Sequence, residues 1–103
     1  MDEEEMRKMA EEMSKIPGMP KPIFIKVEFD RDLQNITGKK EIHMVVSLGA
    51  TFAYVLQNIF IEYPGIEKKY PPGELGFNID GTPPKTYTPI FDGDVIRLSV
   101  RAY

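Results

Sequence analysis

The sequence contains no cysteine, no tryptophan and a single histidine. Without cysteine there can be no disulfide, no thiolate metal site and no thiolate nucleophile. The one histidine, His43, is expected on the outward face of a strand, and a lone histidine without cysteine cannot build a common zinc site. We therefore predict no metal site in this chain.

The sequence also lacks an excess of positive charge and any long apolar run. Its 13 basic and 16 acidic residues give a net charge of −3, which argues against nucleic-acid binding. Neither a membrane-spanning run nor a signal peptide is present. The default expectation is therefore a cytoplasmic protein that does not associate with membranes.

Motifs that carry catalytic chemistry are missing as well. There is no phosphate-binding Walker motif, no glycine-rich dinucleotide fingerprint and no serine-centred elbow. Asp92 and Asp94 resemble a carboxylate pair, but they flank a turn glycine and need no catalytic role. We therefore predict that the chain is not an enzyme, with no catalytic residues and no cofactor.

The N-terminal region is set apart by its composition. Residues 1–16 hold six acidic residues, and methionine recurs at helical spacing, so this stretch predicts an amphipathic helix. Residues 17–22 contain three prolines and predict a stiff linker. The folded domain is therefore expected to span residues 23–103.

Two interpretations of this N-terminal helix stay open. A helix this short is marginal in water and could be a frayed extension. Alternatively, Met6, Met9 and Met13 form a docking stripe, because methionine adapts to irregular surfaces. Its target would be a partner protein or, within the chain, the outward residues Tyr54 and Ile61 of the main predicted helix.

The remaining sequence predicts an α+β domain. Four segments are expected to be strands, chiefly because apolar and polar residues alternate: 23–29, 41–47, 75–79 and 95–100. Residues 85–88, which prolines bracket, predict at most a short fifth strand at an edge. One helix follows Thr51, its predicted N-cap, carries an apolar face from Phe52 to Tyr63 and ends at Pro64. This order predicts one helix laid across one face of a mixed sheet of four or five strands.

Six short motifs, in their order and spacing, indicate a family. They are Ile25-Lys-Val-Glu-Phe29, Thr37-Gly-Lys39, Gly49-Ala-Thr51, Tyr63-Pro-Gly65, Ile79-Asp-Gly81 and Thr88-Pro-Ile-Phe-Asp-Gly-Asp-Val95. The pattern over residues 23–103 resembles the ubiquitin-like β-grasp proteins, and among them the MoaD/ThiS group. That group comprises the molybdopterin synthase small subunit, the thiazole-synthesis sulfur carrier and the archaeal ubiquitin-like modifiers.

The resemblance implies a function located at the C-terminus. Family members end in a flexible Gly-Gly tail, whose carboxylate a partner enzyme activates as an acyl-adenylate for sulfur transfer or protein modification. Glycine suits such a tail because it lacks a Cβ atom. This sequence ends instead in Arg101-Ala102-Tyr103. Either the tail has been lost or the sequence stops short of it; we favour loss.

The resemblance also implies protein partners, namely an adenylating enzyme or a synthase large subunit. The outward face of the predicted sheet mixes apolar residues with arginine, a composition typical of protein interfaces. The predicted partner-binding residues are Phe24, His43, Val45, Arg97, Arg101 and Tyr103. We therefore expect a ubiquitin-like protein that acts by docking, as a sulfur carrier or modifier if a Gly-Gly tail exists. The alternative is a non-catalytic structural or regulatory subunit of a multi-protein complex.

Overall fold

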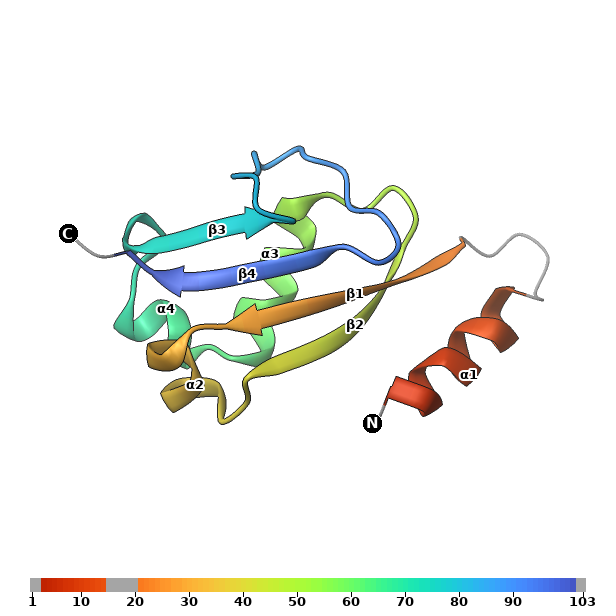
Figure 1. Cartoon of the computed structure of the whole chain (residues 1–103), viewed down its shortest axis with the longest axis horizontal. Helices are drawn as coiled ribbons and strands as arrows, with labels where there is room; N and C mark the ends of the chain where they lie inside the picture. Colours follow the sequence, from red (N-terminus) through yellow and green to blue (C-terminus); the bar gives the residue numbers. More distant parts are fainter. Residues whose placement is uncertain (1–2, 15–20, 102–103) are drawn as a thin grey trace.

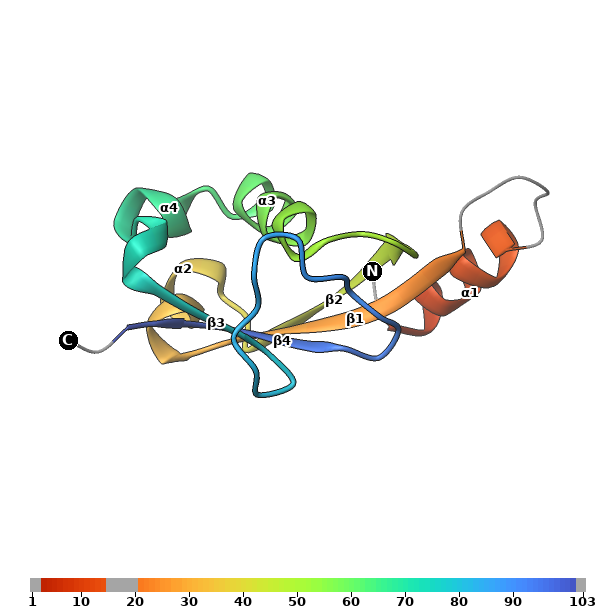
Figure 2. The same cartoon turned by 90° about the horizontal axis from the view of Figure 1, so that it is seen from above.

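The computed structural model describes residues 3–14 and 21–101. It contains four strands, β1 (Pro22–Phe29), β2 (Glu41–Ser47), β3 (Leu75–Ile79) and β4 (Val95–Val100), and four α-helices, α1 (Glu3–Ser14), α2 (Arg31–Thr37), α3 (Phe52–Glu62) and α4 (Gly65–Lys69). A 3₁₀ turn, η1 (Pro72–Glu74), precedes β3. Figure 2 shows α3 and α4 on one side of the sheet. The predicted α+β class is confirmed.

The sheet is mixed, with the strand order β2-β1-β4-β3 (Figure 1). β1 pairs with β2 antiparallel and with β4 parallel, and β3 pairs with β4 antiparallel. The last strand of the chain therefore lies inside the sheet, where both of its edges are hydrogen-bonded. This placement confirms that the final strand belongs to the core.

Alternating burial along the strands builds the hydrophobic core. In β1, every second residue from Ile23 to Phe29 is buried, and in β4 Ile96 and Leu98 are buried. These side chains pack against Phe52, Val55 and Ile59 of α3, together with Leu33, Ile42, Val46, Ile66, Leu75 and Ile90. Burial of this apolar surface is the main force that joins the helix to the sheet.

The main helix begins as the sequence predicts. Thr51 is its N-cap, and its hydroxyl oxygen accepts a hydrogen bond from the Tyr54 N–H at 3.3 Å. The Tyr63 N–H closes the last turn on the carbonyl of Ile59 at 2.8 Å. A short second helix, α4, then starts at Gly65, directly after the predicted stop.

The predicted short strand at residues 85–88 is wrong. The Thr88 N–H bonds to the Lys85 carbonyl at 3.1 Å, and the Thr88 hydroxyl accepts the Lys85 N–H at 2.8 Å. This local turn uses the backbone groups that a strand needs for a ladder. β3 is consequently the outermost strand at its side of the described sheet.

Aspartates fix the turns that lead into β4. The Asp92 carboxylate accepts the Phe24 N–H at 2.7 Å, and Asp94 accepts the Phe91 N–H at 2.8 Å. Asp80, at a positive φ of 51°, accepts the Val95 N–H at 3.1 Å. Burial raises the pKa of the Asp94 carboxyl, and the neighbouring Asp80 raises it further, although the Phe91 N–H lowers it.

Because the Asp80 and Asp94 carboxylates are neighbours, we predict that Asp80→Asn raises the free energy of unfolding in a pH-dependent way. A raised folded-state pKa means that Asp94 favours folding at low pH, and this contribution is lost as pH rises through the folded pKa. Asparagine removes the adjacent charge, still accepts the Val95 N–H and tolerates a positive φ. We expect a gain of a few tenths of a kcal/mol at pH 7 that disappears at pH 3. Urea unfolding at both pH values measures it, with the exposed Asp32→Asn as the charge-matched control; equal gains at both pH values would contradict the coupling.

Candidate protein-docking face

The sheet face opposite α3, here called the open face, gathers side chains from all four strands. It comprises Phe24, Lys26 and Glu28 of β1, Glu41, His43 and Val45 of β2, Val95, Arg97 and Ser99 of β4, and Gly76 and Asn78 of β3. The strand register places Val45 opposite Phe24 and His43 opposite Lys26. Arg97 lies between Glu28 and Asn78 on the neighbouring strands. The open face therefore brings together four residues of the predicted interface.

A chain of charges runs across the open face. The Arg97 Nε donates to Glu28 Oε1 at 2.7 Å, and Lys26 Nζ lies 3.8 Å from carboxylate oxygens of both Glu28 and Glu41. His43 Nε2 lies 3.5 Å from Glu41 Oε2. The hydrogen bond from Arg97 is the main cause that lowers the pKa of Glu28. Such exposed ion pairs add little to stability, so their main effect is to orient the side chains.

The predicted interface did not include Glu28 or Glu41, which the structure places beside Arg97 and His43. Alternation alone places them on the same face as His43. Their pairing follows only from the register between strands, which the sequence does not state. Arg97 keeps two thirds of its side chain exposed, at 66%, although it is bonded to Glu28. It is therefore oriented and still available to a partner.

Two hollows adjoin Arg97, and both are lined by Glu28, Asn78 and Arg97. Their volumes are about 440 and 360 Å³. The Asn78 Oδ1 is buried and has no hydrogen-bond partner among the described residues. Unsatisfied buried acceptors are uncommon in folded proteins, which marks this part of the face as one that a donor from water or a partner would complete.

Helix α1 lies beside β1 and β2 and contacts the open face at that end. The Arg7 guanidinium carbon lies 5.3 Å from the centre of the Phe24 ring, within cation–π range. Met6 lines a hollow with Glu41 and His43. Figure 1 shows α1 beside this end of the sheet, away from the end where β4 finishes. The helix thus leaves the Arg97 side uncovered.

The expected internal target of the methionine stripe is wrong. Tyr54 and Ile61 are 54% and 69% exposed, while α1 contacts β1 and β2 instead. Met9 is 47% exposed. The side chain of Met13 lies outside the described residues. The contact is made through Arg7, because its charged group can stack on the aromatic ring that β1 presents.

The C-terminal end of β4 is held by neighbouring backbone and side chains. The Val100 N–H donates to Asp30 Oδ2 at 2.7 Å, and the Arg101 N–H donates to the Glu74 carbonyl at 2.8 Å. Arg101 is exposed. The predicted site residue Tyr103 lies outside the described residues. The strand is thus fixed as far as Arg101.

Among the described residues, no three histidine, cysteine, aspartate or glutamate side chains come together as a metal site. None of the described helices has the length and apolar character needed to cross a bilayer.

Comparisons with known proteins point to one fold. No family model matches the sequence, and no curated protein matches it. A putative molybdopterin converting factor subunit 1 from Pyrococcus furiosus superposes with a TM-score of 0.70 at 15% identity, covering 78% of this chain and 99% of that one. Small archaeal modifier protein 1 of Haloferax volcanii gives 0.68 at 15% identity with the same coverage. A Caldiarchaeum subterraneum ubiquitin gives 0.55 at 21% identity, covering 80% of this chain and 96% of that one.

These similarities cover nearly the full length of the other chains, and at such identities they establish the fold. The chain therefore has the ubiquitin-like β-grasp fold of MoaD-like subunits and small archaeal modifiers, as its motifs predicted.

Proposed function

We propose that this protein is a ubiquitin-like carrier or modifier that acts by docking to partner proteins. Its contact region would be the uncovered side of the open face and the C-terminal end of β4. The observation that carries the proposal is the position of Arg97: it is oriented by Glu28, exposed, and on the same strand that leads to the C-terminus. Proteins of the same fold are described as a molybdopterin converting factor subunit and as modifiers.

The chemistry of a carrier requires both a docking surface and a positioned C-terminus. The terminal carboxylate of such a protein attacks the α-phosphorus of ATP within a partner enzyme, which releases pyrophosphate and leaves an acyl-adenylate. The carrier itself supplies a docking surface and a positioned C-terminus. The hydrogen bonds that the Val100 and Arg101 N–H groups donate support this role because they anchor the C-terminal end of β4.

The first experiment is the intact mass of the protein purified from its native host, with its C-terminus sequenced. A terminal Gly-Gly with oxygen replaced by sulfur, or with an isopeptide-linked protein, is the expected result for a carrier or modifier. An unmodified chain in a stable complex would favour the second candidate, a non-catalytic subunit that would be tethered through α1 and its exposed Met9. A chain with neither modification nor partner would contradict both.

Once a partner has been identified, Arg97→Glu tests whether that partner binds to the open face. We expect roughly tenfold weaker binding, because the reversal breaks the pair with Glu28 and repels a partner's carboxylate. Isothermal titration calorimetry measures the change. Arg31→Glu, the same charge reversal at an exposed position on α2, is the matched control. Equal effects of the two variants would place the docking surface elsewhere.

A further inference from the structure

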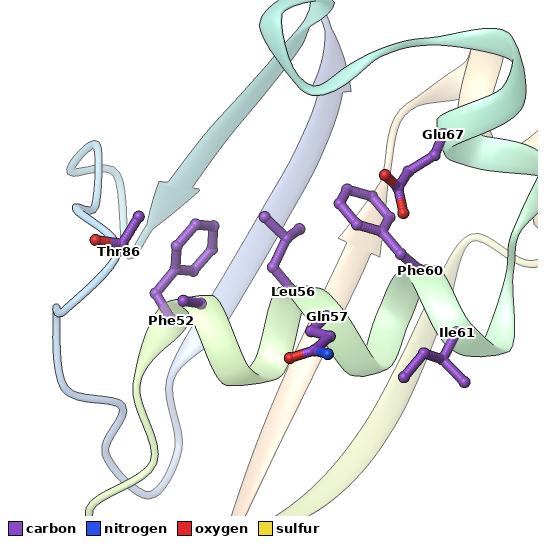
Figure 3. A pocket seen from close by; sticks show the side chains of 8 residues that line it. Phe52, Leu56, Gln57, Phe60, Ile61, Glu67 and Thr86 are labelled. Atoms are coloured by element: carbon purple, nitrogen blue, oxygen red, sulfur yellow. The ribbon is translucent and has the colours of Figure 1, made fainter.

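A groove opens on a different side of the molecule, between α3, α4 and the segment 82–88 (Figure 3). Its volume is about 450 Å³. It is lined by Phe52, Ala53, Leu56, Gln57, Phe60, Ile61, Glu67 and Thr86. None of these residues belongs to the open face, so the groove is separate from the proposed docking region.

The groove has an apolar wall supplied by one flank of α3. Phe52, Leu56 and Phe60 are spaced four residues apart, and Figure 3 shows their side chains projecting from the same flank. The Phe52 ring packs edge-on against Phe77 of β3, with 5.4 Å between ring centres. The wall therefore leads to β3, the outermost strand at this side of the sheet.

The β3 edge offers backbone groups for a further strand. Arg101 donates to the Glu74 carbonyl and Asp80 donates to the Val95 carbonyl. In an antiparallel ladder this register directs the backbone of Gly76 and Asn78 toward β4. The N–H and C=O of Phe77, between them, consequently point away from β4 toward the open edge. The Ile79 groups pair with Thr82, so the available stretch lies around Phe77.

Among the described residues that line the groove, one side chain is ionisable, that of Glu67. Figure 3 shows its carboxylate near the Phe60 ring, inside the groove. Glu67 has no ion pair or side-chain hydrogen bond with any described residue. A carboxylate beside an apolar wall favours a ligand that brings a cation next to an apolar group.

We propose that this groove and the β3 edge bind an extended peptide segment of a partner protein by strand addition. The segment would pair with the Phe77 backbone, place alternate apolar side chains against Phe52, Leu56 and Phe60, and set a lysine or arginine against Glu67. In strand addition, main-chain hydrogen bonds give affinity and pockets for alternate side chains give specificity.

The charge of the groove argues for a partner peptide over a second copy of this chain. Self-pairing through β3 would bring Leu-Gly-Phe-Asn-Ile into the site, and this segment contains no basic residue. Glu67 would then stay unpaired beside apolar surface. A basic, alternating segment satisfies the backbone, the apolar wall and the carboxylate together.

The test selects random displayed peptides against the full chain and then maps the enriched peptides by NMR. We expect alternating apolar sequences with a lysine or arginine, and amide shifts at Ala53, Phe60, Phe77 and Thr86. Exchange of the Phe77 amide should slow on binding because the peptide accepts its hydrogen bond. Absence of enrichment, or shifts confined to the open face, would overturn the proposal.

Glu67→Lys distinguishes specific binding of a basic peptide from nonspecific binding to the apolar wall. We expect roughly tenfold weaker binding of the basic peptide. Glu62→Lys, an equal charge change at an exposed α3 position outside the groove, should leave affinity within about twofold. Circular dichroism confirms that both variants fold. Equal affinity of the two variants, or a dimer formed through β3 in sedimentation velocity, would also overturn the proposal.

Discussion

Leu98→Ala is expected to lower the free energy of unfolding by about 3 to 4 kcal/mol, the largest single effect that we predict. Leu98 is 1% exposed and lies on β4 between Phe29 of β1 and Phe77 of β3. Truncation would remove apolar contacts from both sides and leave a cavity, because paired strands on either side cannot close onto it. For a domain with a stability of about 5–15 kcal/mol, this is a large share.

Urea unfolding, followed by circular dichroism, measures this loss. The matched control is Leu48→Ala, the same chemical change at a position that is 53% exposed, where we expect less than about 0.5 kcal/mol. Similar losses at the two positions would contradict the placement of β4 at the centre of the sheet.

The sequence predicts the strands and the main helix because their periodicities are complete. In β4, the alternation of apolar and polar residues correctly predicts that Ile96 and Leu98 are buried. The alternation does not predict that β4 pairs with β1 on one side, in parallel, and with β3 on the other, antiparallel. The failed strand at residues 85–88 has a local cause. The Thr88 hydroxyl and backbone N–H bond to Lys85 and form a turn, which replaces the hydrogen bonds of a strand. Threonine side chains that bond to nearby backbone groups favour turns over strands in this way.

The short helices are a second limit of sequence-based prediction. α2 has only seven residues, too few for a periodic pattern, and depends on its ends. The Asp30 carboxylate accepts the Leu33 N–H at 2.9 Å at one end, and Gly38 adopts a left-handed φ of 74° at the other. Capping of this kind follows from three-dimensional position as much as from residue type.

In the candidate site, too, the sequence predicts which face a residue lies on but not what packs against it. Alternation places Phe24, His43 and Arg97 on the open face, but it says nothing about what lies over them. The packing of α1 was predicted from its methionines, whereas the contact in the structure joins Arg7 to the Phe24 ring. Charged residues on a short helix carry no signal that identifies an aromatic partner distant in sequence.

One residue connects fold and site more than any other. Asp30 caps α2 through Oδ1 and accepts the Val100 N–H through Oδ2, and its own N–H donates to the Leu98 carbonyl at 3.1 Å. These bonds join the end of β1, the start of α2 and the end of β4. The position of the C-terminal end of β4 therefore depends on a carboxylate about seventy residues away.

Asp30→Ala is accordingly expected to lower the free energy of unfolding by about 2 to 3 kcal/mol. Loss of the cap costs about 1 kcal/mol, and the half-buried Val100 N–H, left without its acceptor, adds about 1 to 2 kcal/mol. The exposed Asp32→Ala, in the first turn of the same helix, is the matched control and should cost far less.

Hydrogen exchange distinguishes this specific role from general destabilisation. In Asp30→Ala, the Val100 amide should exchange faster by a larger factor than the amide of Val27, which lies in the buried centre of β1. Asp30→Asn retains one acceptor oxygen, so it should preserve either the cap or the bond to Val100. Its Val100 exchange rate should therefore lie between those of the wild type and Asp30→Ala. A uniform increase across both amides would mean that Asp30 supports the whole domain. A local increase at Val100 would mean that this carboxylate sets how firmly the C-terminal end of β4 is held.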